Sequence, residues 1–245
     1  MPIIYLSPST QEFNPYVNGG NEEFYMNLIA DAMIPYLTAS GIEYVRNTPD
    51  MTAASSIAAS NNGNYDLHLA LHSNAAGGGN SGNVRGSEVY YYPNSQNSER
   101  AAQIIANNLK LIYPLPDRVI TVPTTTLGEV VRTRAPAVLI EFAYHDNPQD
   151  ADWIKNNINA IAQNVVLSLT DYFDIPFVMP QPIFFGTVVT SSGAPLNIRS
   201  GPNINTYIKG RVPNGQQVKV LADLLDWYLI EYNGVTGYVA GRYVV

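Results

Sequence analysis

Three histidines are the first residues to consider for chemistry, because the chain contains no cysteine. A bound transition metal would need imidazole, carboxylate or other oxygen ligands. His68 and His72 share a segment that predicts a strand at 66–72, where they would lie on one face but roughly 13 Å apart, at about 3.3 Å per residue. Unless the strand breaks, they cannot share a metal ion. His72 ends the strand, where open α/β sheets bind ligands, so it is the better candidate and His68 is expected to be structural.

Glu141 is the second candidate. It closes the most apolar segment of the chain, Pro-Ala-Val-Leu-Ile-Glu, and a buried carboxylate is costly unless it binds a ligand or transfers a proton. Burial would raise its pKa toward that of a useful general base. His145 follows four residues later, where a loop could fold it back toward the same pocket.

Two adjacent carboxylates, Glu22 and Glu23, open a predicted helix at 22–39. Carboxylates stabilise the positive end of a helix dipole, so capping alone explains both of them. Any further role would fall to one of the two. The glycine-rich segment at 77–82 lacks the Gly-Lys-Ser/Thr ending of a phosphate loop and predicts a flexible loop.

The elements that must position these residues form two domains. Hydrophobic residues make up 46% of the chain and charged residues 13%, which excludes a disordered protein. Residues 1–174 alternate short apolar segments with helical periodicity and predict an α/β domain with a mixed, mostly parallel sheet flanked by helices. A proline-rich linker is expected at 175–186 and a small all-β barrel at 187–245. The expected strands are 3–6, 42–46, 66–72, 86–92 and 137–141, and the expected helices are 22–39, 98–112 and 150–173.

Charge and hydropathy exclude several classes of partner. The formal net charge of −7 argues against binding to nucleic-acid phosphates or anionic lipids. No segment approaches the roughly 18 apolar residues of a membrane span, and the first residues lack the pattern of a signal peptide. We therefore expect no nucleic-acid partner, no membrane insertion and an exit route that uses no signal peptide.

Taken in order, three motifs resemble the zinc-dependent N-acetylmuramoyl-L-alanine amidases of the Amidase_3 type, over residues 3–173. In that family a Glu at a helix start precedes Asn-Leu-x-Ile-Ala, a Ser-Ile-His-x-Asn-Ala segment follows, and a second Glu ends an apolar strand. The matching segments here are Glu23-Phe-Tyr-Met-Asn27-Leu-Ile-Ala30, Leu71-His72-Ser-Asn-Ala75 and Pro136-Ala-Val-Leu-Ile-Glu141.

The resemblance implies a role for each matching residue. Glu23 and His72 would be zinc ligands, with Glu23 favoured over Glu22 by its spacing to the Asn-Leu-Ile-Ala motif, and Glu141 would be the general base. Asn74 is expected to contact substrate.

The family's first histidine ligand is missing. In its place this chain reads Leu-Ser-Pro-Ser-Thr10-Gln11. A branch of the family that opens with Ser-Pro-Ser-x-Gln also carries His-Asp-Asn after the catalytic Glu. We therefore hypothesise that His145 supplies the lost ligand or a substrate contact, with Thr10 and Gln11 as the alternative ligands.

The C-terminal segment resembles a bacterial SH3-like domain through Leu-Asn-Ile-Arg-Ser-Gly-Pro at 196–202 and Gly-Tyr-Val-Ala-Gly-Arg-Tyr at 237–243. Such domains commonly bind peptidoglycan peptides, and Trp227 and Tyr238 would be contacts, although packing in the barrel explains Trp227 equally well.

The expected function is hydrolysis of the amide between N-acetylmuramic acid and L-alanine, with Zn²⁺ as cofactor and peptidoglycan as partner. The enzyme would act on the wall after release by lysis or another route, as a phage-type lysin does. The alternatives are an inactive amidase-like protein that binds wall fragments and a zinc peptidase that cuts the stem peptide.

Overall fold

The computed structural model describes residues 1–224 and 226–245. The chain folds into two compact units, formed largely by residues 2–175 and 176–245, and each is described separately.

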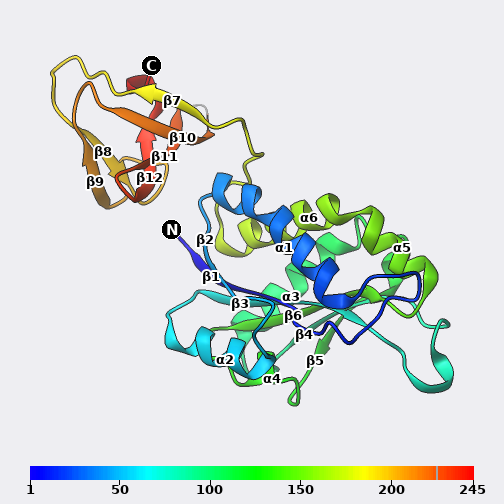
Figure 1. Cartoon of the computed structure of the whole chain (residues 1–245). Helices are drawn as coiled ribbons and strands as arrows, with labels where there is room; N and C mark the ends of the chain where they lie inside the picture. The colour runs from blue at the N-terminus through cyan, green and yellow to red at the C-terminus, as the bar shows by residue number, and fades with distance from the viewer. Residues whose placement is uncertain (225) are drawn as a thin grey trace. The chain divides into compact units, whose positions relative to one another are not determined.

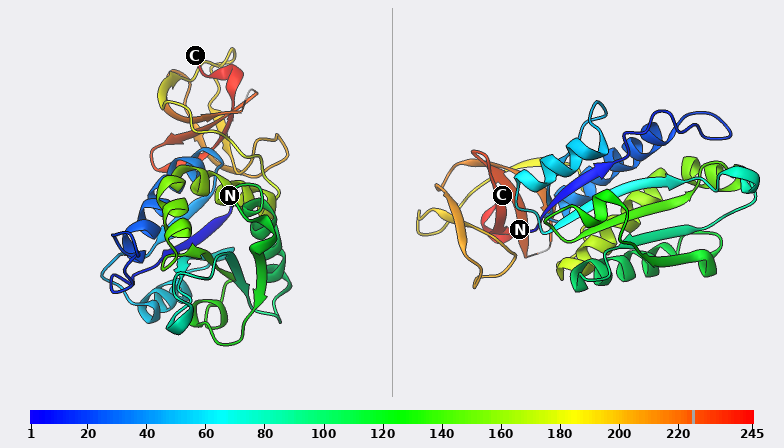
Figure 2. Two further views of the ribbon diagram at one scale, coloured as in Figure 1. Left: turned by 90° about the vertical axis from the view of Figure 1, so that its right-hand side faces the viewer. Right: turned by 90° about the horizontal axis from the view of Figure 1, so that it is seen from below.

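The larger unit is a six-stranded sheet with helices on both faces (Figures 1 and 2). The strand order is β2-β1-β3-β6-β4-β5. Neighbours β1 and β3, β3 and β6, and β4 and β5 run parallel, whereas β4 and β6 run antiparallel. The predicted mixed, mostly parallel α/β fold is confirmed. The strands are β1 Ile3–Pro8, β2 Glu43–Arg46, β3 Leu67–Asn74, β4 Ser87–Tyr91, β5 Val119–Pro123 and β6 Ala137–Tyr144.

Strands β3 and β6 form the centre of this sheet, and both are buried along nearly their whole length. Seven of the eight residues of each strand are buried, as expected for strands that helices cover on both faces. Both strands run past their expected ends, to Asn74 and Tyr144. Their carboxyl ends therefore meet at one edge of the sheet, with His72 and Glu141 in register.

Six α-helices surround the sheet in the described part of the chain. The helix expected at 150–173 is two helices, because Asn157 ends the first: its backbone N–H bonds to Ile154 O and its side chain donates to Trp153 O. The sequence did not predict α2, whose composition is small and polar, or α4, which is one turn long. The helices are α1 Glu22–Ala39, α2 Ala53–Asn62, α3 Gln96–Leu109, α4 Gly128–Val131, α5 Pro148–Asn156 and α6 Ile158–Phe173.

The smaller unit is an antiparallel sheet in the order β7-β10-β11-β12-β8-β9. It encloses an apolar core that includes Val218, Val220, Ile230 and Val239. A two-residue turn at Asn233-Gly234, with positive φ at both positions, joins β11 to β12, as tight hairpins require. The strands are β7 Phe184–Thr187, β8 Leu196–Arg199, β9 Ile208–Val212, β10 Gln217–Asp223, β11 Trp227–Tyr232 and β12 Val235–Ala240. Among the described residues, no helix is long and apolar enough to cross a membrane.

Candidate active site

His72 is the centre of a buried polar cluster at the carboxyl end of β3. Its Nδ1 lies 2.8 Å from Glu22 Oε1, in the first turn of α1, and its Nε2 lies 3.1 Å from Glu129 Oε2, in α4. All three residues are buried. Burial alone would lower the pKa of His72, but hydrogen bonds to the two carboxylates outweigh it and raise that pKa well above its ordinary value. The ring is held in one orientation by partners on both of its nitrogens.

Behind Nε2, a closed hydrogen-bond network surrounds Glu129. Its Oε1 accepts from Ser7 Oγ at 2.5 Å and lies 3.3 Å from His68 Nε2, while His68 Nδ1 lies 3.0 Å from Ser60 Oγ. Burial acts to raise the pKa of Glu129, but the hydrogen bonds with His68 and His72 outweigh it and hold that pKa far below its ordinary value. His68 thus supports the network from mid-strand, consistent with the structural role expected for it.

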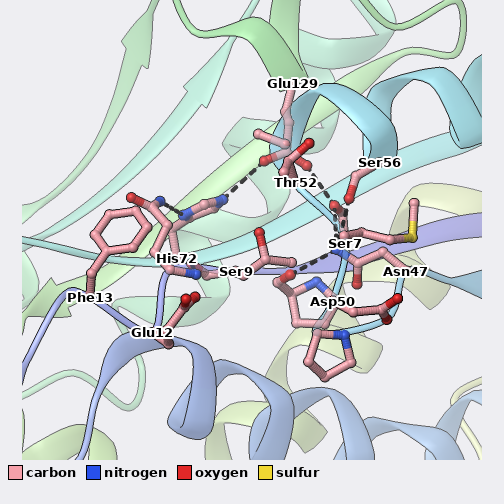
Figure 3. Close-up of a pocket in the computed structure, with 16 residues that line it drawn as sticks. Ser7, Ser9, Glu12, Phe13, Asn47, Asp50, Thr52, Ser56, His72 and Glu129 are labelled. Atoms are coloured by element: carbon pink, nitrogen blue, oxygen red, sulfur yellow. Dashed lines mark hydrogen bonds and ion pairs between the residues drawn. The ribbon is translucent and has the colours of Figure 1, made fainter.

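On the Nδ1 side, a second set of polar groups contacts the ring. Gln11 Nε2 lies 3.4 Å from His72 Nδ1. Asn14 Nδ2 donates to Gln11 Oε1 at 3.1 Å and to Glu22 Oε2 at 2.6 Å. Burial acts to raise the pKa of Glu22, but hydrogen bonds and the charge of His72 lower it overall. A cavity, of about 540 Å³, has His72 and Glu129 on its wall together with residues of the β1–α1 and β2–α2 loops (Figure 3).

Glu141 lies beside His72 on the neighbouring strand. The residue is partly exposed, but its Oε2 is buried and has no hydrogen-bond partner among the described residues. Burial raises its pKa to about 8, against an opposing effect of His72 and with the support of Glu22, Glu88 and Glu129. A carboxyl group with a pKa near the working pH is suited to accept a proton and return it.

Glu88 on β4 forms a second polar cluster directly opposite Glu141 in the antiparallel register. Its carboxylate accepts from Tyr90 OH at 2.5 Å, Tyr144 OH at 3.1 Å and Asn74 Nδ2 at 3.2 Å. Asn74, expected to contact substrate, therefore lies at the same edge of the sheet and is held by Glu88.

The structure brings together only some of the residues expected to bind metal. Glu22, not Glu23, turns its carboxylate to His72, whereas Glu23 is partly exposed. His145 makes no hydrogen bond with His72 or Glu22 among the described residues: its Nδ1 lies 2.8 Å from Ser73 O and its ring stacks on Tyr16 at 5.3 Å between centroids. The zinc-ligand roles expected of Glu23 and His145 gain no support from this geometry.

Sequence reasoning missed Glu129 and Glu88 altogether. Glu129 sits in a single helical turn that carries no periodic signal, and Glu88 looks like the exposed position of an alternating strand. Within the described residues, no group of three or more His, Cys, Asp or Glu side chains could hold a metal. A three-ligand metal centre here would need a donor of another type.

Comparison of the sequence with known protein families identifies the family of each domain. The sequence matches the family model for N-acetylmuramoyl-L-alanine amidase over residues 11–171. The chain belongs to this amidase family. A bacterial SH3 domain matches residues 194–245, which confirms the resemblance predicted for both parts of the chain.

Solved structures of amidases share the fold of the amidase domain. AmiC2 of Nostoc punctiforme, an N-acetylmuramoyl-L-alanine amidase, superposes with a TM-score of 0.61 at 16% identity, over 71% of this chain and 97% of that one. The catalytic domain of CD27L, an endolysin that targets Clostridia difficile, gives 0.57 at 22% identity, over 70% and 97% of the two chains. These superpositions establish a common fold.

A curated relative matches a shorter segment. It is the N-acetylmuramoyl-L-alanine amidase YrvJ of Bacillus subtilis, described as putative, which is 38% identical over 56 residues. The match covers 23% of this chain and 11% of the relative.

The two residues of the SH3 domain that were expected to contact a ligand differ in their exposure. Trp227 is partly exposed and lines a pocket of about 250 Å³ with Arg199, Ile204 and Tyr243. Tyr238 is only 4% exposed and packs with buried apolar residues. Trp227 can therefore meet a ligand in this conformation, whereas Tyr238 serves the core.

Proposed function

We propose that this chain hydrolyses the amide that joins the lactyl group of N-acetylmuramic acid to L-alanine in peptidoglycan. Membership of the amidase family and the shared fold support peptidoglycan amide hydrolysis. The observation that carries the proposal is the buried, unpartnered Oε2 of Glu141 beside His72. An orphaned carboxylate oxygen at the carboxyl end of a central strand is suited to a water or a substrate atom.

Glu22 and His72 are the residues that fit zinc. Their donor atoms lie 2.8 Å apart, and neutral imidazole and carboxylate are groups that zinc binds in proteins. When bound there, zinc would polarise the scissile carbonyl and make an attacking water more acidic. Glu129 supports this role because its bond to Nε2 fixes the tautomer and orientation that leave Nδ1 free to coordinate.

Glu141 supplies the proton transfers of the proposed reaction. In its ionised form it takes a proton from the attacking water as the C–O bond forms. It then returns that proton to the nitrogen of L-alanine as the C–N bond breaks. Water adds across the amide, so the products are the lactyl carboxylic acid and a free amino terminus, and Glu141 regains its initial state.

The SH3 domain is proposed to hold the enzyme on the wall through the Trp227 pocket. Covalent linkage to a wall-binding domain would raise the local concentration of substrate at the amidase domain. Peptidoglycan, as glycan and stem peptide, is thus the proposed partner of both domains.

One observation favours a second candidate, an inactive amidase-like protein that binds wall fragments. Both nitrogens of His72 already have carboxylate partners, so the cluster is satisfied as a hydrogen-bonded group without a metal. Affinity for walls without release of peptides would support this candidate.

The test is digestion of purified cell walls, followed by mass spectrometry of the released peptides. The wild-type protein should release peptides with free L-alanine amino termini. Glu141→Gln, which removes the base and keeps the side-chain shape, should reduce the rate by about 10²- to 10⁴-fold. Cleavage within the stem peptide would instead identify a peptidase, and bound but intact walls would identify the inactive candidate.

A further inference from the structure

Gln11 ends beside the same ring nitrogen that faces Glu22. Its side-chain nitrogen lies 3.4 Å from His72 Nδ1, and Glu22 Oε1 lies 2.8 Å from that atom. A ring nitrogen carries either one hydrogen or one lone pair, so it can donate to the carboxylate or accept from the amide, but cannot do both. When Nδ1 donates to Glu22, the Gln11 amide N–H therefore faces a nitrogen that has no lone pair to accept from it.

A cation where these three side chains meet removes the conflict. With the Gln11 amide turned by half a rotation, its oxygen joins Glu22 Oε1 and His72 Nδ1, so that three electron-pair donors face one position. In a tetrahedral zinc site with bonds of about 2.0–2.2 Å, neighbouring donors lie roughly 3.3–3.6 Å apart. The observed separations of 2.8 and 3.4 Å need only small movements to reach these values.

The surrounding contacts hold Gln11 in place. The backbone N–H of Ser9 bonds to Leu71 O at 2.9 Å, which ties the loop to β3 next to His72, and Ser9 Oγ accepts from Gln11 N at 3.3 Å. Asn14 donates to both Gln11 and Glu22. Turning the amide breaks the bond from Asn14 to Gln11 and brings the two side-chain NH2 groups together, so Asn14 must shift away from Gln11 and keep only its bond to Glu22.

The two other residues considered from the sequence lack this placement. His145 directs Nδ1 at the carbonyl of Ser73, with its ring stacked on Tyr16. Thr10 lines the cavity one residue before Gln11, and its hydroxyl has a shorter reach.

We propose that the side-chain oxygen of Gln11 is the third ligand of the zinc site, beside Glu22 and His72. This inference rests on the proposed function, because it completes the same site. A neutral amide oxygen is a harder donor than imidazole, so the site should bind zinc more weakly than a site with two histidines and should accept Mn²⁺ more readily.

Zinc affinity tests this proposal without use of the amidase reaction. The dissociation constant of the full-length protein is measured by competition with a chelator, and Co²⁺ absorption reports the coordination geometry. Gln11→Ala should weaken zinc binding at least about tenfold, since even loss of a group behind a ligand costs 10- to 100-fold. Gln11→His, which supplies an imidazole, should strengthen it by at least about tenfold. Thr10→Ala is the matched control and should leave the affinity within about twofold.

Each other outcome overturns the assignment. Zinc affinity of Gln11→Ala within about twofold of wild type would show that Gln11 is no ligand. A wild-type protein without zinc, alongside a Gln11→His variant that binds it, would show that the natural site is not a metal site. The gain expected for Gln11→His cannot arise from misfolding.

Failure of the proposed function is read separately, from the peptides released by wild-type protein. Cleavage of the amide together with an unchanged affinity in Gln11→Ala would defeat only the ligand assignment. Zinc binding that depends on Gln11, without cleavage, would defeat only the amidase proposal.

Discussion

The two sides of the His72 ring differ in how completely their partners are satisfied. On the Nε2 side, Glu129 is enclosed by Ser7 and His68, and every contact pairs an acceptor with a group able to donate. On the Nδ1 side, Glu22 and Gln11 compete for one nitrogen. The closed side, at Nε2, can orient the ring, and the contested side, at Nδ1, can bind a ligand. This division explains how one histidine can be both rigid and available.

The largest expected effect separates the two adjacent carboxylates of α1. Glu22→Gln should weaken zinc binding by more than about 100-fold, because it removes a charged ligand rather than a group behind one. Glu23→Gln, which removes the same charge one residue away, should change the affinity by less than about twofold. Competition with a chelator measures both variants. Equal losses in the two variants would contradict the assignment of Glu22, and not Glu23, as the zinc ligand.

The closed side is expected to matter for stability. Glu129→Ala should lower the free energy of unfolding by about 3 kcal/mol. The substitution removes a buried carboxylate and leaves the ring nitrogens of His68 and His72 without their partner. Glu12→Ala, on the exposed rim of the same cavity, should change it by less than about 0.5 kcal/mol. Denaturant unfolding in the presence of a chelator gives both numbers. A neutral Glu129→Ala would mean that the network contributes nothing to the fold.

The SH3 domain offers a contrast, because its proposed contact lies at the surface instead of in a buried network. Trp227→Ala should weaken sedimentation with purified walls about tenfold, as expected for one aromatic contact residue. The rate at which the Trp227→Ala variant hydrolyses a soluble muramoyl peptide should stay at the wild-type value. If the rate on the soluble peptide fell as much as wall binding, Trp227 would act through the fold.

The last expected effect is a pH-dependent change in melting temperature. Burial raises the pKa of Glu141 from 4.5 to about 8, so between these values the native state holds a proton that the unfolded state has released. Stability from this group is therefore present below about pH 4.5 and is lost as pH rises toward 8. Glu141→Gln removes that loss.

The metal-free melting temperature of Glu141→Gln should thus exceed that of wild type near pH 8, and the difference should become smaller as the pH is lowered toward 4.5. Glu12→Gln, which removes an exposed carboxylate, serves as the control. A difference that shrinks as pH rises would contradict the pKa assigned to Glu141.

The sequence by itself determined the fold class and the centre of the site. Segments of strand length predicted β3 and β6, with His72 and Glu141 near their carboxyl ends, and the family resemblance placed both residues in one site. The strands follow from local pattern, because strands buried on both faces contain long runs of buried, mainly apolar residues.

Only the tertiary structure decided which partners His72 has. Adjacent helix residues point about 100° apart, so the packing of α1 on the sheet, and not the motif spacing, selects Glu22 over Glu23. Glu129 is 57 residues from His72 and Gln11 is 61 residues away, and neither carries a local signal. Such long-range contacts depend on the path of the loops that join the strands. For that reason our proposal of Gln11 as the third ligand rests on the fold, whereas the sequence left the choice open between His145, Thr10 and Gln11.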